Sequence, residues 1–283
     1  MRFGFNLLLW TTFVEAEHTR LIERLKEIGY DGVEIPAGDG PVDHYHSVRK
    51  MADGAGLACT AIAMATPEAD PTSPDPAVRR AALDRIKSRI ECAHILGSPI
   101  LGGPLYAAHK LFHDELPGEE EFKRSAEVLA QAGDFAEEAD VTLCLEPLNR
   151  FEIQLVNTTA DARRIVDLAG HARVTVHYDT HHAHIEESSH EQAFEVCTGH
   201  LGHVHFSESH RGTLGTGMVD WEAVGRGLAA SQFDGWCVVE SFGTAVDGLR
   251  QAANVHRDCF ESRDEVAVKA LPFMRQYTGR QRR

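Results

Sequence analysis

The sequence lacks the features that mark secreted and membrane-spanning proteins. Its six cysteines stand at positions 59, 92, 144, 197, 237 and 259, without a CxxC pair. Several lie inside apolar runs, a pattern typical of reduced, buried thiols and not of a disulfide or zinc framework. No apolar run is long enough to span a bilayer, and the N-terminal run is too short for a secretion signal. These absences favour a cytoplasmic protein.

Positive charge is also scarce. The 283 residues include 28 Lys and Arg against 43 Asp and Glu, which gives a formal net charge of −15. Such a surface repels phosphate backbones and anionic lipids, so we expect neither a nucleic-acid nor a membrane partner. The basic end, 279–283, is expected to be a solvated tail. No low-complexity tract or domain boundary interrupts the chain, which predicts one domain over 1–283.

Strand-like and helical patterns alternate eight times along the chain. The strand-like runs are almost continuously apolar, as expected of parallel strands buried on both faces. No glycine-rich fingerprint follows the first run, which disfavours a doubly wound sheet and favours a closed (β/α)₈ TIM barrel. Strands are predicted at 3–9, 32–35, 57–65, 99–103, 141–146, 174–179, 201–205 and 236–240. Helices are predicted at 15–28, 42–55, 77–96, 118–139, 160–168, 191–198, 221–230 and 246–277.

The last four predicted strands each end in a side chain that can bind a metal. These side chains are Glu146, Asp179, His205 and Glu240, which lie 33, 26 and 35 residues apart. A strand, its helix and the return to the next parallel strand need roughly 30 residues. The spacing therefore predicts one ligand per consecutive strand, all at the C-terminal end of the barrel, where such barrels carry their active sites.

Three carboxylates and one imidazole suit a hard or borderline divalent ion. Mn²⁺, Mg²⁺ and Co²⁺ fit this set better than a thiolate-preferring ion, and Zn²⁺ accepts the same ligands. Each of the four residues alone is as readily a polar strand end with a local partner. Four of them at this spacing favour a metal site.

Glu146 and Glu240 come from the first and last strands of this set, so they can face each other across a substrate. A metal that polarises a carbonyl acidifies the neighbouring C–H bond. One carboxylate can then remove the proton and a second return it from the opposite face, which inverts the carbon. A single base working on one edge would instead move the carbonyl. The residues alone leave epimerisation and aldose–ketose isomerisation open.

Six motifs stand out along the chain: GFNLLLW (4–10), DGVEIP (31–36), LEPLNRFE (145–152), YDTHHAHIEE (178–187), HVHFSESHRGTLGTGMVDW (203–221) and VVESF (238–242). They resemble the ketose 3-epimerase family (D-tagatose, D-allulose and L-ribulose 3-epimerases) of the xylose-isomerase-like barrels. The resemblance implies Mn²⁺ or Co²⁺ bound by Glu146, Asp179, His205 and Glu240. It also implies that Glu146 and Glu240 exchange the C3 proton of a free ketose through a cis-enediolate, in a homo-dimer or homo-tetramer.

The resemblance also implies a set of substrate contacts. The family's substrate-binding Glu, His and Arg fall on Glu152, His182 and Arg211, and its pocket-wall positions on Trp10, Glu34 and Leu105. Taken alone, these residues have plainer interpretations. Glu152 suits a surface acid beside a helix, His182 a solvated histidine, and Trp10 and Glu34 a packing residue and an ion-pair residue.

Arg211 precedes the glycine-rich run GTLGTG, in a loop after the seventh predicted strand. Barrels often bind phosphate in that loop, and its backbone donors can hold an anion, so the residues alone leave a phosphorylated sugar open. The family pattern favours a free sugar. His181 and His184 depart from that pattern, as do the loops around Met64 and 105–113, so the preferred ketose stays open.

Three other functions compete with the epimerase. The first keeps the fold and the metal and changes the reaction, as in an aldose–ketose isomerase, an inosose dehydratase or an enzyme eliminating from a 3-keto sugar. The second is an apurinic-site endonuclease, which the negative charge disfavours. The third is a sugar-binding protein whose metal is purely structural. The Glu146–Glu240 pair and the LEPLNRFE motif favour epimerisation.

Overall fold

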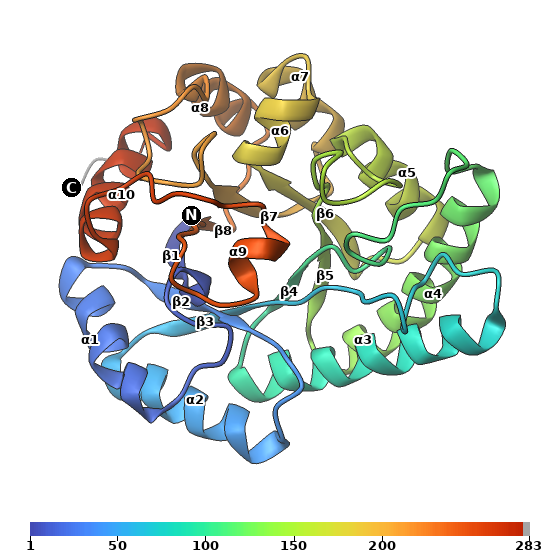
Figure 1. Cartoon of the computed structure of the whole chain (residues 1–283), viewed down its shortest axis with the longest axis horizontal. Helices are drawn as coiled ribbons and strands as arrows, with labels where there is room; N and C mark the ends of the chain where they lie inside the picture. The colour runs from blue at the N-terminus through green and yellow to red at the C-terminus, as the bar shows by residue number, and fades with distance from the viewer. Residues whose placement is uncertain (280–283) are drawn as a thin grey trace.

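The computed structural model describes residues 1–279, which form a closed barrel of eight parallel strands in chain order (Figure 1). The barrel closes where β1 pairs with β8, with Arg2 opposite Trp236 and Phe5 opposite Val239. This confirms the predicted (β/α)₈ TIM barrel. The strands are β1 (Arg2–Asn6), β2 (Gly32–Pro36), β3 (Ala58–Ile62), β4 (Ile100–Gly103), β5 (Thr142–Leu145), β6 (Val174–Asp179), β7 (Leu201–Phe206) and β8 (Trp236–Val239).

Helices surround the barrel and bury its outer face (Figure 1). Helices α1, α2 and α3 end at Gly29, Gly56 and Gly97, whose backbones are left-handed and close the last helical turn. The helices are η1 (Leu7–Leu9), η2 (Ala16–His18), α1 (Thr19–Ile28), α2 (Val42–Ala55), α3 (Pro76–Leu96), α4 (Glu119–Glu138), α5 (Thr159–Ala169), α6 (Thr180–Glu186), α7 (His190–Cys197), α8 (Trp221–Ala230), α9 (Leu249–Ala252) and α10 (Arg263–Tyr277).

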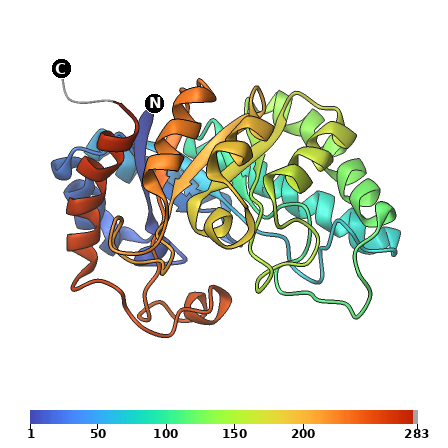
Figure 2. The same cartoon turned by 90° about the horizontal axis from the view of Figure 1, so that it is seen from above.

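The continuous helix predicted over 246–277 is wrong. The chain forms the short α9, then a loop, and then α10. The break has a local cause, because Asn254 takes a left-handed backbone and the Lys110 ammonium donates to the Gln251 carbonyl and the Asn254 side chain. These contacts tie α9 to the loop between β4 and α4. Figure 2 shows both segments extending from the same side of the barrel.

The interior of the barrel carries an unusual amount of polar side chain. TIM barrels generally fill this space with branched apolar residues. Here the described strands place a buried polar layer inside, below the C-terminal strand ends. Its members are Asn6, Glu34, Thr60, His177 and His203, all inaccessible to solvent.

Helix α6 was not predicted. It begins directly after β6, because the Asp179 carboxylate accepts hydrogen bonds from the backbone N–H groups of His181 and His182. None of the helices in the described part of the chain is both long and apolar enough to cross a membrane. Except for Gly279, the basic tail expected over 279–283 lies outside the described residues.

We expect Gly32→Ala to destabilise the barrel. A Cβ at Gly32 would lie 2.6 Å from the Trp236 ring and 2.7 Å from the Ala58 carbonyl oxygen, so strand or ring must shift. Overpacking of this kind costs about 1–3 kcal/mol of unfolding free energy. As a control, Gly54→Ala in α2 meets no neighbouring atom and should stabilise by about 0.5–1 kcal/mol. Chemical denaturation measures both, and equal stabilities of the two variants would contradict the packing at Gly32.

Candidate metal centre and active site

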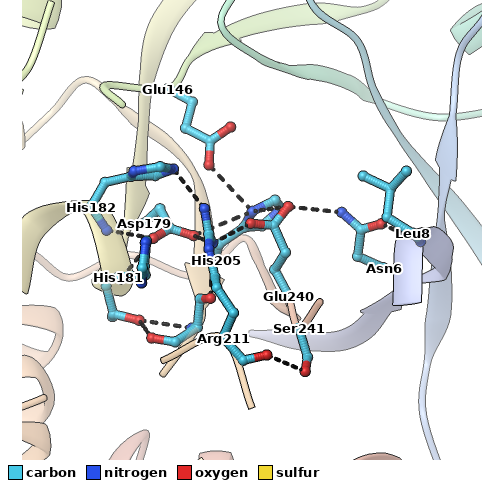
Figure 3. A network of polar contacts seen from close by, with 12 residues as sticks. Asn6, Leu8, Glu146, Asp179, His181, His182, His205, Arg211, Glu240 and Ser241 are labelled. Carbon is cyan, nitrogen blue, oxygen red and sulfur yellow. Dashed lines mark hydrogen bonds and ion pairs between the residues drawn. The ribbon is translucent and has the colours of Figure 1, made fainter. Parts of the chain in front are cut away.

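The structure brings the four predicted metal ligands to one point. Strand register places Asp179 of β6 opposite His205 of β7, while Glu146 and Glu240 directly follow β5 and β8. All four side chains are buried, and each offers a donor atom within 4.8 Å of the other three (Figure 3). The C-terminal ends of four consecutive strands thus form one donor cluster.

His205 Nδ1 lies at the centre of this cluster. It is 3.4 Å from Glu240 Oε1, 3.5 Å from Glu146 Oε1 and 3.7 Å from Asp179 Oδ2. Both His205 Nδ1 and Glu146 Oε1 are buried without a hydrogen-bond partner. Buried polar atoms are rarely left without a hydrogen-bond partner. Two such atoms that point to the same place therefore fit the ligands of a bound cation.

Two further groups of three buried donors adjoin the cluster. One of them shares His205 and offers only imidazole nitrogens. The other includes His182, whose Nε2 is 2.9 Å from the Arg211 guanidinium, so a cation there would face a fixed positive charge. The oxygen-rich group is therefore the best-suited place for a hard divalent ion.

The charges of the cluster shift its pKa values strongly. Burial raises the pKa of Glu146 to about 8, and the negative charges of Glu240 and Asp179 add to the rise. Burial opposes the charged form of Asp179 as well, but Arg211 and His182 hold the pKa of that carboxyl well below its usual range. Burial disfavours the imidazolium of His205, yet Glu34 and Glu240 raise its pKa well above the usual value. The site carries excess negative charge that a cation would offset.

Arg211 supplies the fixed positive charge beside the cluster. Its guanidinium donates to Glu240 Oε2 at 2.6 Å and to Ser207 Oγ at 2.9 Å, and lies 3.4 Å from Asp179 Oδ2. The residue has a left-handed backbone with φ of +61°, which a side chain other than glycine adopts only under constraint. The loop after β7 thus holds the Arg211 side chain beside the metal-ligand cluster, and the backbone of Arg211 is strained as a result.

A cavity of about 400 Å³ opens above the donors, within the range of small-molecule sites. Five predicted site residues line it, whereas Asp179 and His205 lie beneath its floor. Its outer wall is largely apolar and includes Leu249 and Ala252 of α9. The five are Glu146, Glu152, His182, Arg211 and Glu240.

Glu152 and His182 form a buried hydrogen-bonded group with Asn149. Asn149 donates from its side chain to Glu152 Oε1 at 2.8 Å and from its backbone to His182 Nδ1 at 2.9 Å. Nδ1 therefore accepts and the ring proton of the neutral form is on Nε2, so the 2.9 Å contact between Nε2 and the Arg211 guanidinium brings two donors together. Burial lowers the pKa of His182, and the Arg211 charge lowers it further, so the ring is a neutral donor. These contacts overturn the plainer interpretations of a surface acid and a solvated histidine.

The assignment of Trp10, Glu34 and Leu105 as cavity walls stays a prediction. None of the three is among the described residues that line the cavity. Trp10 packs on the Phe5 ring with centroids 5.1 Å apart, and Leu105 is part of the hydrophobic core. Glu34 lies inside the barrel, below the donors, because side chains alternate along β2 and its carboxylate reaches His203 and His205 of β7.

Two residues at the cavity were not predicted as site residues. His109 lines the cavity from the loop after β4, with Nε2 3.4 Å from Glu152 Oε2. Asn149 lies within the LEPLNRFE motif and orients both Glu152 and His182. The motif itself was a signal for Asn149. His109 follows no periodic pattern, since a loop places it.

The glycine-rich loop after β7 already holds an anion of its own. The Glu208 carboxylate accepts the backbone N–H groups of Ser209, Gly215 and Val219 and the indole N–H of Trp221, at 2.8–3.2 Å. These donors are therefore not available to a phosphate. Apart from Arg211, no residue of this loop lines the cavity among those described.

Comparison with known proteins places the chain in a family. The family described as xylose isomerase-like TIM barrel matches residues 22–276. The L-ribulose 3-epimerase of Mesorhizobium japonicum is 31% identical, over 96% of this chain and 93% of its own length. The D-psicose 3-epimerase of Ruminiclostridium cellulolyticum is 30% identical, over 97% of both chains.

Solved structures agree with the sequence relatives. The D-allulose 3-epimerase of a Methylomonas species, crystallised in complex with D-allulose, superposes with a TM-score of 0.92. It is 27% identical and covers 98% of this chain and 97% of its own. The chain therefore belongs to the xylose isomerase-like TIM barrel family and, within it, to the ketose 3-epimerase family.

Proposed function

We propose that this protein is a metal-dependent epimerase that inverts C3 of a free ketose. The observation that carries the proposal is the position of Glu146 and Glu240. Both belong to the buried donor cluster and both line the cavity above it. Two carboxylates that adjoin a cation site and a substrate space fit a reaction that needs two positioned proton carriers.

The proposed metal ligands are Glu146, Asp179, His205 and Glu240. A divalent ion fits the unpaired atoms His205 Nδ1 and Glu146 Oε1 and the net negative charge of the four side chains. Mn²⁺ is proposed first, with Co²⁺ or Mg²⁺ as alternatives. Such an ion would lower the energy of negative charge on the ketose carbonyl oxygen and so make the C3–H bond more acidic. The protein's own side chains then carry the proton.

One carboxylate removes the proton from C3, and the electron pair of the C–H bond shifts toward the C2 carbonyl. The other carboxylic acid returns a proton to C3 from the opposite face, which inverts that carbon. After one turnover Glu146 and Glu240 have exchanged protonation states, so solvent must restore them. Solvent hydrogen should therefore appear at C3.

The remaining polar residues of the cavity are proposed to bind and orient the sugar. Glu152 accepts from hydroxyl groups, because its carboxylate stays ionised: burial alone would raise its pKa, but the His109 hydrogen bond and the Arg211 charge lower it. Neutral His182 and the Arg211 guanidinium donate to sugar oxygens. Together they favour one orientation of the ketose above the carboxylates.

A free sugar fits this site better than a phosphorylated one. Backbone N–H groups of the glycine-rich loop donate hydrogen bonds to the Glu208 carboxylate, and most of the loop lies away from the cavity. The names of the relatives suggest D-tagatose, D-fructose/D-allulose or L-ribulose as substrates. A single domain, a cytoplasmic location and a homo-dimer or homo-tetramer are proposed on the sequence analysis and family resemblance alone.

We expect the Mn²⁺-loaded protein to incorporate deuterium at C3 of a ketose in D₂O and to form the C3-inverted ketose. D-fructose, D-tagatose and L-ribulose would be tested, with products separated by chromatography and deuterium located by NMR. Glu240→Gln should lower exchange by about 10²–10⁴-fold, the contribution of a positioned acid–base group. Glu222→Gln, on the exposed face of α8, should leave it unchanged.

The position of the label decides between the competing reactions. Deuterium at C1 or C2 together with an aldose product would identify an aldose–ketose isomerase. If the metal binds and no tested ketose exchanges, the epimerase proposal fails for these sugars, and inososes and 3-keto sugars become the next substrates.

Mn²⁺ affinity should depend on pH. In the ion-free protein Glu146 keeps its proton up to about pH 8, because its pKa is raised, and a ligand oxygen must be deprotonated. Affinity should therefore rise between pH 6 and 8, by up to about tenfold per unit for each displaced proton, and should continue to rise above pH 8 as His205, whose pKa is also raised, gives up its proton. Electron paramagnetic resonance of free Mn²⁺ would measure it. Glu146→Gln should make the dependence between pH 6 and 8 shallower, and a flat wild-type profile would argue against Glu146 as a ligand.

A further inference from the structure

Below the candidate metal centre, Glu34 is the hub of a hydrogen-bond network inside the barrel. Its side chain is 0% exposed and accepts four hydrogen bonds from three other strands. Oε1 accepts from Thr60 at 3.0 Å and faces His203 Nε2 at 2.8 Å, and Oε2 accepts from Asn6 at 3.0 Å and faces His205 Nε2 at 2.6 Å. The charge is therefore fully satisfied without solvent.

We propose that Glu34 and Asn6 are positioning residues that fix His205 and Glu240 for metal binding and proton exchange. The inference rests on the proposed function, because it assigns these residues to the same centre. Neither side chain lines the cavity among the described residues, so neither would touch the sugar. Their effect would pass through the two ligands.

Glu34 selects which nitrogen of His205 faces the donors. A carboxylate accepts hydrogen bonds, so the close contact with Nε2 places a proton on that nitrogen. When a cation displaces the proton of the other nitrogen, Nδ1, the lone pair of that atom points toward Glu146, Asp179 and Glu240. A carboxylate behind a ligand histidine also makes the imidazole a stronger base and holds its ring in one orientation.

Asn6 connects the same carboxylate to Glu240. Its side-chain oxygen accepts the backbone N–H of Leu8 at 2.9 Å, which points the amide NH₂ away from β1 and into the barrel. The NH₂ group donates to Glu34 Oε2 at 3.0 Å and to Glu240 Oε1 at 3.2 Å (Figure 3 shows the contacts to Leu8 and Glu240). One amide thus orients the carboxylate behind His205 and the proton carrier itself.

The network crosses the barrel, which explains why it can position atoms accurately. Asn6, Glu34 and Thr60 come from β1, β2 and β3, whereas His203 and His205 come from β7, which lies opposite β3 in the closed ring. Each residue lies on a paired strand of a closed sheet, so small displacements meet resistance from both neighbours. Sites built on strands are held more closely than sites built on loops.

The test compares Glu34→Gln with Glu208→Gln. Both are buried glutamates whose side chains accept four hydrogen bonds. The Glu208 side chain contacts none of the four proposed metal ligands. We expect Glu34→Gln to weaken Mn²⁺ binding by about 10–100-fold, the usual effect of losing such a partner. Glu208→Gln should lower stability while leaving Mn²⁺ affinity within about twofold. Thermal unfolding confirms that each variant is folded.

A spectroscopic signal separates positioning from general destabilisation. In the Co²⁺-loaded protein, the Nε2 proton of a ligand histidine gives a strongly shifted proton resonance that disappears in D₂O. This resonance should be present in the wild type and in Glu208→Gln, and should shift or vanish in Glu34→Gln. If Glu34→Gln does not fold, Asn6→Ala provides the measurement. We expect its Mn²⁺ affinity to be about tenfold weaker, and its kcat to fall by a larger factor than KM changes.

The outcomes are distinguishable from a failure of the proposed function, because Mn²⁺ affinity and the Co²⁺ resonance need no sugar. If the wild type exchanges no ketose proton and Glu34→Gln still loses metal affinity and the resonance, the positioning role stands and the reaction is reassigned. If folded Glu34→Gln or Asn6→Ala binds Mn²⁺ as the wild type does, with an unchanged resonance, the proposal is overturned. Equal losses in Glu34→Gln and Glu208→Gln would also overturn it.

Discussion

The structure depends on concentrating negative charge at one buried point. Five buried carboxylates lie at or just below the C-terminal end of the barrel. Arg211 and His205 are the positive partners of four of them, and the fifth, Glu152, lies 3.4 Å from His109. Burial makes like charges costly, which is why Glu146 is held protonated and His205 is held charged in the ion-free chain. A divalent ion would relieve that cost. The five are Glu34, Glu146, Glu152, Asp179 and Glu240.

The closed barrel is suited to this constraint because it arranges the charges at two depths. The outer layer adjoins the cavity and contains the ligands proposed to exchange protons and hold the metal. The inner layer contains Glu34 with Asn6, Thr60 and His203, all inaccessible to solvent, and it meets the outer layer at His205. Rigid strands carry both layers. The loops add Arg211, His109 and the short α9, which shape the substrate space without forming the centre.

How much could be predicted from the sequence follows from this arrangement. Glu146, Asp179, His205 and Glu240 were found because each ends an apolar strand, and strand ends of one barrel meet at one face. The contacts of Glu34 with His203 and His205 could not be predicted, because a single sequence shows which face of a strand a residue occupies, but not which residues lie opposite across the barrel. The prediction of one continuous helix over 246–277 was wrong for a different reason. Its helical pattern continues through Asn254, whose left-handed backbone is held by a contact with distant Lys110.

The loop around Glu208 has a consequence for engineering. Three backbone N–H groups and one indole N–H converge on a single side-chain carboxylate, so the loop is an anion site whose occupant is encoded in the chain. Protein evolution often gains a ligand by building a new pocket. In this loop, the replacement of one codon would remove the occupant and release four donors together, making the loop a ready starting point for selecting binders of small inorganic anions.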